Sequence, residues 1–375
     1  MKRFSIVLSA VLLLVALLTG AVQAAPEPIR IGLNLEMTGA VAAYGQMGYE
    51  GIQTLKEIVP FKVLGRPIEL VLVDNKSDKV EAANATSRLI EQSKVVAIIG
   101  PMISGSMLAA GPIAERYHVP IIGPSTTNPL TTQDKKYVFR ACFIDPFQAT
   151  VAAKFAYQNL KARRAAVLSD IANDYCVALG NFFIKEFKSF GGQVVSVQYI
   201  KAGDQDFSAQ LTAIKNANPD VLYIPNYYTE DALAAIQARQ LGLNVPMLSG
   251  DGADAPELFK IGGQAVEGLM NTAFWHEKAA TSQLSKQYVA AYRKKYHKDP
   301  NAFGALAADS MLIIMDAIKR AGSTDPVKIR QAMEETKDLP VVTGFVTIHN
   351  GDAVKAAVIR KAHNGQWDYL ATVNP

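Results

Sequence analysis

Two short apolar runs that end in the same way constrain the fold of this chain more than any other feature. Ile98-Ile99-Gly100-Pro101 and Ile121-Ile122-Gly123-Pro124 repeat the same four residues. Short, branched apolar runs are typical of strands covered on both faces, and each proline ends its strand because it has no N–H to donate. The repeat therefore predicts two buried parallel strands, each followed by a turn.

The turns that follow are polar, which makes them candidate ligand sites. Ser104 lies in the first turn, ahead of a helical pattern, and Ser125, Thr126 and Thr127 lie in the second. Open α/β sheets bind ligands at the carboxyl ends of parallel strands, where hydroxyls and free N–H groups can hold a carboxylate without Arg or Lys. Ser and Thr are also preferred helix caps, so any one of these residues taken alone is more simply explained as a cap.

The first residues have the pattern of a secretory signal peptide. A basic start at residues 1–3 precedes an apolar stretch from Ile6 to Leu18, and Val22-Gln23-Ala24 supplies small residues for cleavage before Ala25. This pattern predicts a cleaved signal peptide over residues 1–24 and export to the periplasm.

Charge and cysteine content exclude several classes of protein. Lys and Arg number 38 against 34 Asp and Glu, a formal net charge of +4 without a clustered basic stripe, so no nucleic-acid partner is expected. Cys142 and Cys176 are the two cysteines. Neither has the spacing of a metal site, so we expect no metal and no cofactor. Export permits a disulfide between them, but their spacing leaves the bond and two buried thiols as equal alternatives.

Enzyme signatures are missing from the sequence. It contains no GxSxG, no HExxH, no Walker loop and no GxGxxG after the first strand. We therefore expect a binding protein and not an enzyme.

Strand and helix patterns alternate twice along the chain, with a break around Tyr137 to Asp145. Each series predicts a parallel sheet with helices on both faces, which gives two doubly wound α/β lobes with a hinge and a ligand cleft between them. The expected domains are residues 25–145 plus 276–345 for the first lobe and residues 146–275 plus 346–375 for the second.

The order and spacing of several motifs resemble the periplasmic binding proteins for leucine, isoleucine and valine that feed ABC importers. This resemblance covers the mature chain and implies the type I periplasmic binding protein fold. The motifs are Ile29-Arg30-Ile31-Gly32, Thr38-Gly39, Tyr44-Gly45, Ile99-Gly100-Pro101, Pro124-Ser125-Thr126-Thr127-Asn128-Pro129, Phe139-Arg140, Asp174-Tyr175 and Gly203-Asp204-Gln205-Asp206-Phe207-Ser208.

The resemblance also implies a ligand site. In that family the two polar turns hold the carboxylate and ammonium of an amino acid, which assigns Ser104, Ser125 and Thr127 to these roles, and an acid after a strand pairs with the ammonium, which is Asp251 here. A zwitterion in a closed cleft needs such partners because both charges lose their hydration. The remaining expected ligand-binding residues are Tyr44, Met102, Ile103, Thr126, Tyr175, Tyr227 and Phe303.

Three positions depart from the pattern of the family. Asp251 is one methylene shorter than the Glu of the aliphatic amino acid binders, Phe303 occupies a position where the family can carry Tyr, and Ser77 and Ile103 replace the cysteines of a family disulfide. The implied protein is a monomer that binds an amino acid with a neutral side chain and delivers it to an ABC permease in the inner membrane. Two alternatives remain: a binder of an amide, urea or aromatic carboxylate on the same fold, and a sensory ligand-binding module.

Overall fold

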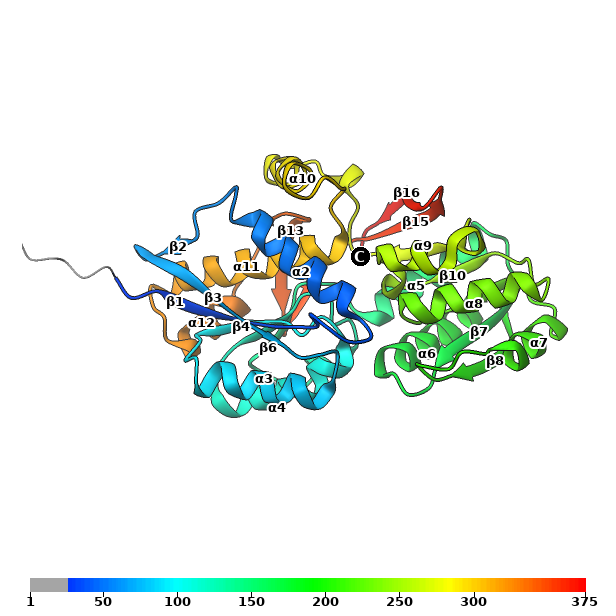
Figure 1. Cartoon of the computed structure of the whole chain (residues 1–375), viewed down its shortest axis with the longest axis horizontal. Helices are drawn as coiled ribbons and strands as arrows, with labels where there is room; N and C mark the ends of the chain where they lie inside the picture. The colour runs from blue at the N-terminus through cyan, green and yellow to red at the C-terminus, as the bar shows by residue number, and fades with distance from the viewer. Residues whose placement is uncertain (1–25) are drawn as a thin grey trace, which may run out of the picture.

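A computed structural model describes residues 26–375, so the predicted signal peptide lies outside the described residues. The chain forms two α/β lobes side by side, and late helices return to the lobe that contains the N-terminal strands (Figure 1). No helix among the described residues combines the length and the apolar character that a bilayer crossing requires.

The first lobe is built on a six-stranded sheet with the order β2-β3-β1-β4-β5-β6. All neighbours pair in parallel except β2 and β3, which form an antiparallel hairpin. Helices α3 and α4 pack together on one face of this sheet, and α2 and α11 pack together on the other (Figure 1). The strands are β1 (Ile29–Leu35), β2 (Lys62–Val63), β3 (Arg66–Asp74), β4 (Ala97–Ile99), β5 (Ile121–Gly123) and β6 (Val138–Arg140). The helices are α2 (Ala42–Leu55), α3 (Lys79–Glu91), α4 (Ser104–Tyr117), α10 (Gln283–Tyr296), α11 (Ala302–Ala321) and α12 (Pro326–Glu334), with the short η1 (Pro129–Thr131).

The two repeated runs of the sequence form β4 and β5, which are both interior strands of this sheet. Every residue of both strands is buried, as expected for strands with helices on both faces. Gly100 directly follows β4 with a φ of +93°, and a Cβ there would lie 2.0 Å from the Asn34 carbonyl oxygen. Glycine is therefore required where the chain turns into the cleft.

The second lobe contains a seven-stranded sheet with the order β16-β15-β11-β10-β9-β7-β8. Its β7 to β11 strands are parallel, and β15 and β16 add an antiparallel hairpin at one edge. The strands are β7 (Arg164–Asp170), β8 (Gln193–Ile200), β9 (Val221–Tyr223), β10 (Met247–Ser249), β11 (Met270–Ala273), β15 (Ala357–His363) and β16 (Gln366–Val373). The helices are α5 (Asp145–Gln158), α6 (Asp174–Ser189), α7 (Ser208–Asn216), α8 (Tyr228–Gln240) and α9 (Pro256–Gly262), with the short η2 (Asp251–Ala253), η3 (Gly263–Val266) and η4 (Glu277–Ala279).

A small antiparallel sheet follows α12 and packs against the first lobe. It consists of β12 (Leu339–Val341), β13 (Gly344–His349) and β14 (Asp352–Val354). The backbone N–H of Arg140 in β6 donates to the Gly351 carbonyl, which ties this sheet to β6. From the sequence we expect the chain to pass from the first lobe to the second after residue 345. In the structure, the antiparallel pairing of β13 and β14 continues to Val354, and β15 then joins the second sheet.

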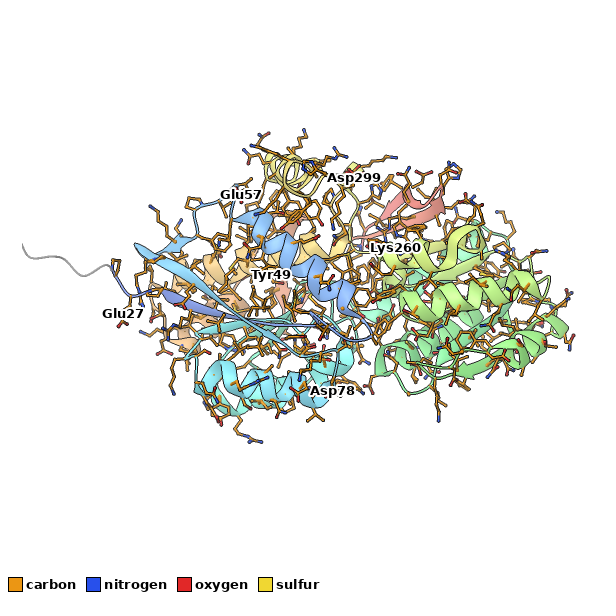
Figure 2. The ribbon with its side chains drawn as sticks, in the orientation of Figure 1. Glu27, Tyr49, Glu57, Asp78, Lys260 and Asp299 are labelled. Carbon is orange, nitrogen blue, oxygen red and sulfur yellow. The ribbon has the colours of Figure 1, made fainter. Side chains whose placement is uncertain are left out.

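Charged side chains are spread over the outside of both lobes. Glu57, Asp78, Lys260 and Asp299 are all exposed and lie on four separate elements or loops (Figure 2). Asp78 also caps α3, because its carboxylate accepts hydrogen bonds from the N–H groups of Val80 and Glu81. This distribution agrees with the dispersed charge of the sequence.

Candidate functional site

All the predicted ligand-binding residues except Thr126 and Thr127 line one cavity between the lobes. The cavity lies where the turns after β4 and β5 face the turns of the second lobe. It is lined by Tyr44, Met102, Ile103, Ser104, Ser125, Tyr175, Tyr227, Asp251, Gly252 and Phe303.

Thr126 and Thr127 are fully buried and do not line the cavity. The carbonyl of Thr126 accepts a 2.8 Å hydrogen bond from Arg140, and the carbonyl of Thr127 accepts one of 3.0 Å from the Asp145 N–H. Both residues therefore hold the second turn in place through their main chains.

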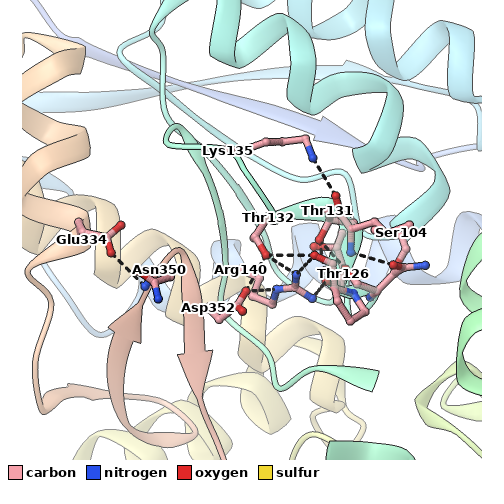
Figure 3. Close-up of polar contacts among 12 residues, drawn as sticks. Ser104, Thr126, Thr131, Thr132, Lys135, Arg140, Glu334, Asn350 and Asp352 are labelled. Carbon is pink, nitrogen blue, oxygen red and sulfur yellow. Dashed lines mark hydrogen bonds and ion pairs between the residues drawn. The ribbon is translucent and has the colours of Figure 1, made fainter. Parts of the chain in front are cut away.

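The buried side chain of Arg140 holds this turn in place. Its guanidinium is fully buried, donates to the carbonyls of Thr126 and Pro129, and forms an ion pair with Asp352 at 2.7 Å (Figure 3). A buried cation needs such partners because it has lost its hydration. One side chain thus joins the cavity turn, β6 and the small sheet.

The first-lobe end of the cavity can donate hydrogen bonds. The Ser104 hydroxyl oxygen accepts the Asn128 N–H at 3.2 Å, so its own hydrogen remains free to donate. Ser104 is also the first residue of α4, and Ile103 before it provides no side-chain cap for the helix. The uncapped N–H groups and the positive end of the helix dipole favour an anion here.

Ser125 has a different capacity from Ser104. Its hydroxyl donates to the Met102 carbonyl at 2.6 Å, which connects the two polar turns. With its single hydrogen already used, the Ser125 oxygen can only accept a further hydrogen bond. A ligand donor such as an ammonium group fits Ser125, whereas a carboxylate fits Ser104.

Asp251 provides the acidic end of the cavity. It directly follows β10, is 4% exposed, and accepts hydrogen bonds at its Oδ1 from Gln148 at 2.8 Å and Tyr175 at 3.0 Å. Burial raises the pKa of Asp251 to about 7, and these two hydrogen bonds oppose the rise. Among residues 26–375 no Lys, Arg or His forms an ion pair with Asp251, so this carboxyl is not neutralised by a protein cation.

Close packing requires a glycine at position 250, directly before Asp251. A Cβ at Gly250 would lie 2.4 Å from the Tyr175 hydroxyl oxygen, which is the group that donates to Asp251. A side chain at this position would therefore displace the tyrosine that holds the carboxylate.

Aromatic rings form the remaining walls. The rings of Tyr44 and Phe303 stack with centroids 4.4 Å apart, and those of Tyr175 and Tyr227 stack at 5.5 Å. Tyr44 also contacts Tyr227 edge to face at 5.6 Å. Together with Met102 these rings give the cavity an apolar part of fixed shape.

The two lobes meet around the cavity through polar contacts. The Tyr44 hydroxyl donates to the Gly252 carbonyl, and the Tyr228 hydroxyl donates to the Ala40 carbonyl at 3.0 Å. Lys79 and Asp174 form an ion pair at 2.6 Å. These bonds connect the lobes in the arrangement that the structure describes.

Several buried residues of the site carried no signal in the sequence. Gln148, which bonds Asp251, lies 103 positions away from it on a helix, and no motif links the two. Glu36 is fully buried and accepts the Met102 N–H at 3.0 Å. Burial raises the pKa of Glu36 to about 7. The two cysteines, Cys142 and Cys176, are both buried thiols that form no disulfide.

Comparison with known proteins agrees with this architecture. Residues 28–366 match the family model described as periplasmic binding protein. A leucine-binding protein LivK from Thermotoga maritima is 49% identical with a TM-score of 0.90, over 92% of this chain and 99% of that one. LivJ from Streptococcus pneumoniae, solved in complex with isoleucine, is 33% identical with a TM-score of 0.88, over 93% of this chain and 100% of that one.

A curated relative leads to the same family. The Leu/Ile/Val-binding protein BraC3 of Rhizobium johnstonii is 30% identical over 323 residues, which are 85% of this chain and 87% of the relative. The resemblance and the type I periplasmic binding protein fold expected from the sequence are confirmed. The chain belongs to the periplasmic binding protein family.

Proposed function

We propose that this protein is the solute-binding component of an ABC importer and that it binds an amino acid with a neutral side chain in the interlobe cavity. One observation carries the proposal: a buried carboxyl without a protein cation, Asp251, faces the same small cavity as the free hydroxyl of Ser104 at an uncapped helix start. A zwitterion supplies the two charges that these groups lack, because its ammonium pairs with Asp251 and its carboxylate with Ser104.

The walls of the cavity support a side chain without charge. Tyr44, Met102 and Phe303 form an apolar surface, which favours an uncharged ligand side chain. The similarity to the leucine-binding protein LivK and to LivJ, which was solved with isoleucine, supports the same class. A micromolar dissociation constant would require roughly 8 kcal/mol of binding free energy.

Closure of the lobes supplies the signal to the partner. A ligand that contacts both lobes stabilises the joined arrangement, and a permease can then select it over an open one. We propose that the exported protein acts in the periplasm as a monomer and docks on an inner-membrane permease with both lobes. Light scattering should give the mass of one mature chain, and the mass of a dimer would contradict this part of the proposal.

A thermal-shift screen of the ligand-stripped mature protein tests the ligand class. The screen compares neutral amino acids with simple amides, urea and aromatic carboxylates. A ligand at 100 times its dissociation constant stabilises the folded state by about 2.7 kcal/mol, which raises the melting temperature measurably. A rise with leucine, isoleucine, valine or phenylalanine supports the proposal, whereas a rise only with amides or aromatic acids contradicts the amino acid assignment. No rise with any compound would favour a sensory module for another ligand.

A further inference from the structure

The side-chain amide of Gln148 on α5 has a hydrogen-bond partner at every donor and acceptor position. It is completely buried, and its oxygen accepts the Asp251 N–H at 2.9 Å and the Thr272 hydroxyl at 2.7 Å. Its nitrogen donates to Asp251 Oδ1 at 2.8 Å and to Asp145 Oδ1 at 3.4 Å. Because a Gln amide has two donor hydrogens and two acceptor lone pairs, every position is used and the amide has one orientation.

Gln148 holds Asp251 at two points. It bonds both the main-chain N–H and the side-chain Oδ1 of the same residue, so the backbone and the carboxylate plane of Asp251 are fixed together. Tyr175 also donates to Oδ1 at 3.0 Å. Both donors bond Oδ1, and no residue within 26–375 donates a hydrogen bond to Oδ2, so Oδ2 is the oxygen left for the ligand ammonium.

The same helix start is attached to the opposite wall of the cleft. Asp145 is the first residue of α5, one turn before Gln148, and is also completely buried. Its N–H donates to the carbonyl of Thr127, which belongs to the second polar turn of the first lobe. Asp145 and Gln148 therefore connect that turn to Asp251 through one helical turn.

From these contacts we infer that Gln148 is the positioning residue that aims Asp251 Oδ2 at the ligand ammonium, with Asp145 fixing the helix start on which Gln148 stands. This inference rests on the proposed function. It assigns part of the selectivity for an α-amino group to a side chain that does not line the cavity. The contacts of the site with the side chain and the carboxylate of the ligand should not depend on Gln148.

Calorimetric titration of two ligands tests the inference. L-leucine carries the ammonium group, and 2-hydroxy-4-methylpentanoate has a neutral hydroxyl in its place with the same carboxylate and side chain. Gln148→Met should weaken leucine binding at least 30-fold, because a hydrogen bond to a charged group is lost and Asp251 is released. Binding of the hydroxy acid should weaken less than fivefold.

Gln237→Met is the matched control. The Gln237 amide accepts the Phe207 N–H at 2.6 Å and donates to the Gln205 carbonyl at 3.0 Å, so it is also hydrogen-bonded through both atoms within the second lobe. Since Gln237 neither lines the cavity nor hydrogen-bonds a residue that lines it, this variant should change the affinity of neither ligand.

A milder variant keeps the test decisive if Gln148→Met does not fold. Thr272→Val removes only the hydroxyl that donates to the Gln148 oxygen, and it should weaken leucine about fivefold and the hydroxy acid less than twofold. Equal losses for both ligands, or no loss, would overturn the positioning role. If the wild-type protein binds no neutral amino acid at all, the proposed function itself fails, which is a distinct result.

Discussion

Ligand binding should depend on pH through Asp251. Burial raises the pKa of this carboxyl to about 7 in the ligand-free protein, so Asp251 is only partly ionised near neutral pH. An ammonium group favours the ionised carboxylate, so the pKa of Asp251 falls when the ligand binds. Affinity should therefore rise with pH through about 7, and binding should release a proton.

The expected magnitude follows from that pKa. Ionised Asp251 amounts to about a tenth of the protein at pH 6 and about nine tenths at pH 8. If the ionised form alone binds the ammonium, the dissociation constant at pH 6 is about tenfold larger than at pH 8, or about 1.4 kcal/mol. At pH 7 binding should release about half a proton.

Isothermal titration calorimetry measures both quantities. Leucine is titrated at pH 6, 7 and 8, and at each pH in buffers of different ionisation enthalpy, which gives the number of protons released. A dissociation constant that stays within twofold over this range, without proton release, would contradict this role of Asp251. It would mean that Asp251 is already ionised or does not contact the ammonium.

Glu36→Gln is the control for this pH dependence. Burial raises the pKa of Glu36 to about 7 as well, and Glu36 accepts the N–H of Met102 beside the cavity. Gln keeps a carbonyl oxygen for this hydrogen bond but does not titrate. The pH dependence of leucine binding should survive this substitution, and its loss would assign the dependence to Glu36.

Three further outcomes are expected. Lys79→Ala, which breaks the half-exposed pair with Asp174 between the lobes, should speed leucine dissociation about two- to fivefold in low salt and less in high salt by stopped-flow fluorescence. Arg30→Ala breaks a similarly exposed pair within the first lobe, so a similar acceleration there would contradict the interlobe role of Lys79. Tyr44→Phe keeps the ring stacking but loses an interlobe hydrogen bond and should weaken leucine by about 1 kcal/mol in calorimetry; unchanged affinity would contradict this role. Because folding raises the pKa of Glu36 above the unfolded value of 4.5, its contribution to stability is lost as pH rises from about 4.5 to 7. Urea denaturation at pH 5 and 8 measures the free energy of unfolding, and the Glu36→Gln variant should lose up to roughly 3 kcal/mol less of it between these pH values than the wild type does. An equal loss in both proteins would contradict the assignment to Glu36.

Local sequence patterns were sufficient to predict the architecture, because strands and turns depend mainly on residues that are close together in the chain. The repeated runs at 98–101 and 121–124 form two fully buried interior strands, as their branched residues and terminal prolines predict. The turns after them lie at the same sheet edge, because neighbouring parallel strands end together. This is why Ser104 and Ser125 could be predicted to face one cavity.

The support around the site could not be predicted in the same way. Gln148 and Asp251 are 103 residues apart, and only the packing of α5 beside the β10 end brings them together. Thr126 has the same residue type as Thr127 and lies beside Ser125, yet neither threonine lines the cavity, and their carbonyls accept hydrogen bonds from Arg140 and Asp145. Such contacts depend on tertiary structure and leave no periodicity in the sequence.

The most direct test of the account compares leucine with two analogues that each lack one charge. Calorimetric titration of the ligand-stripped mature protein uses L-leucine, leucinamide without the carboxylate, and 4-methylpentanoate without the ammonium. We expect leucine to bind at one site and each analogue to bind at least 100-fold more weakly, because Ser104 or Asp251 loses its partner. Binding of either analogue as tight as that of leucine would contradict a cavity built for a zwitterion.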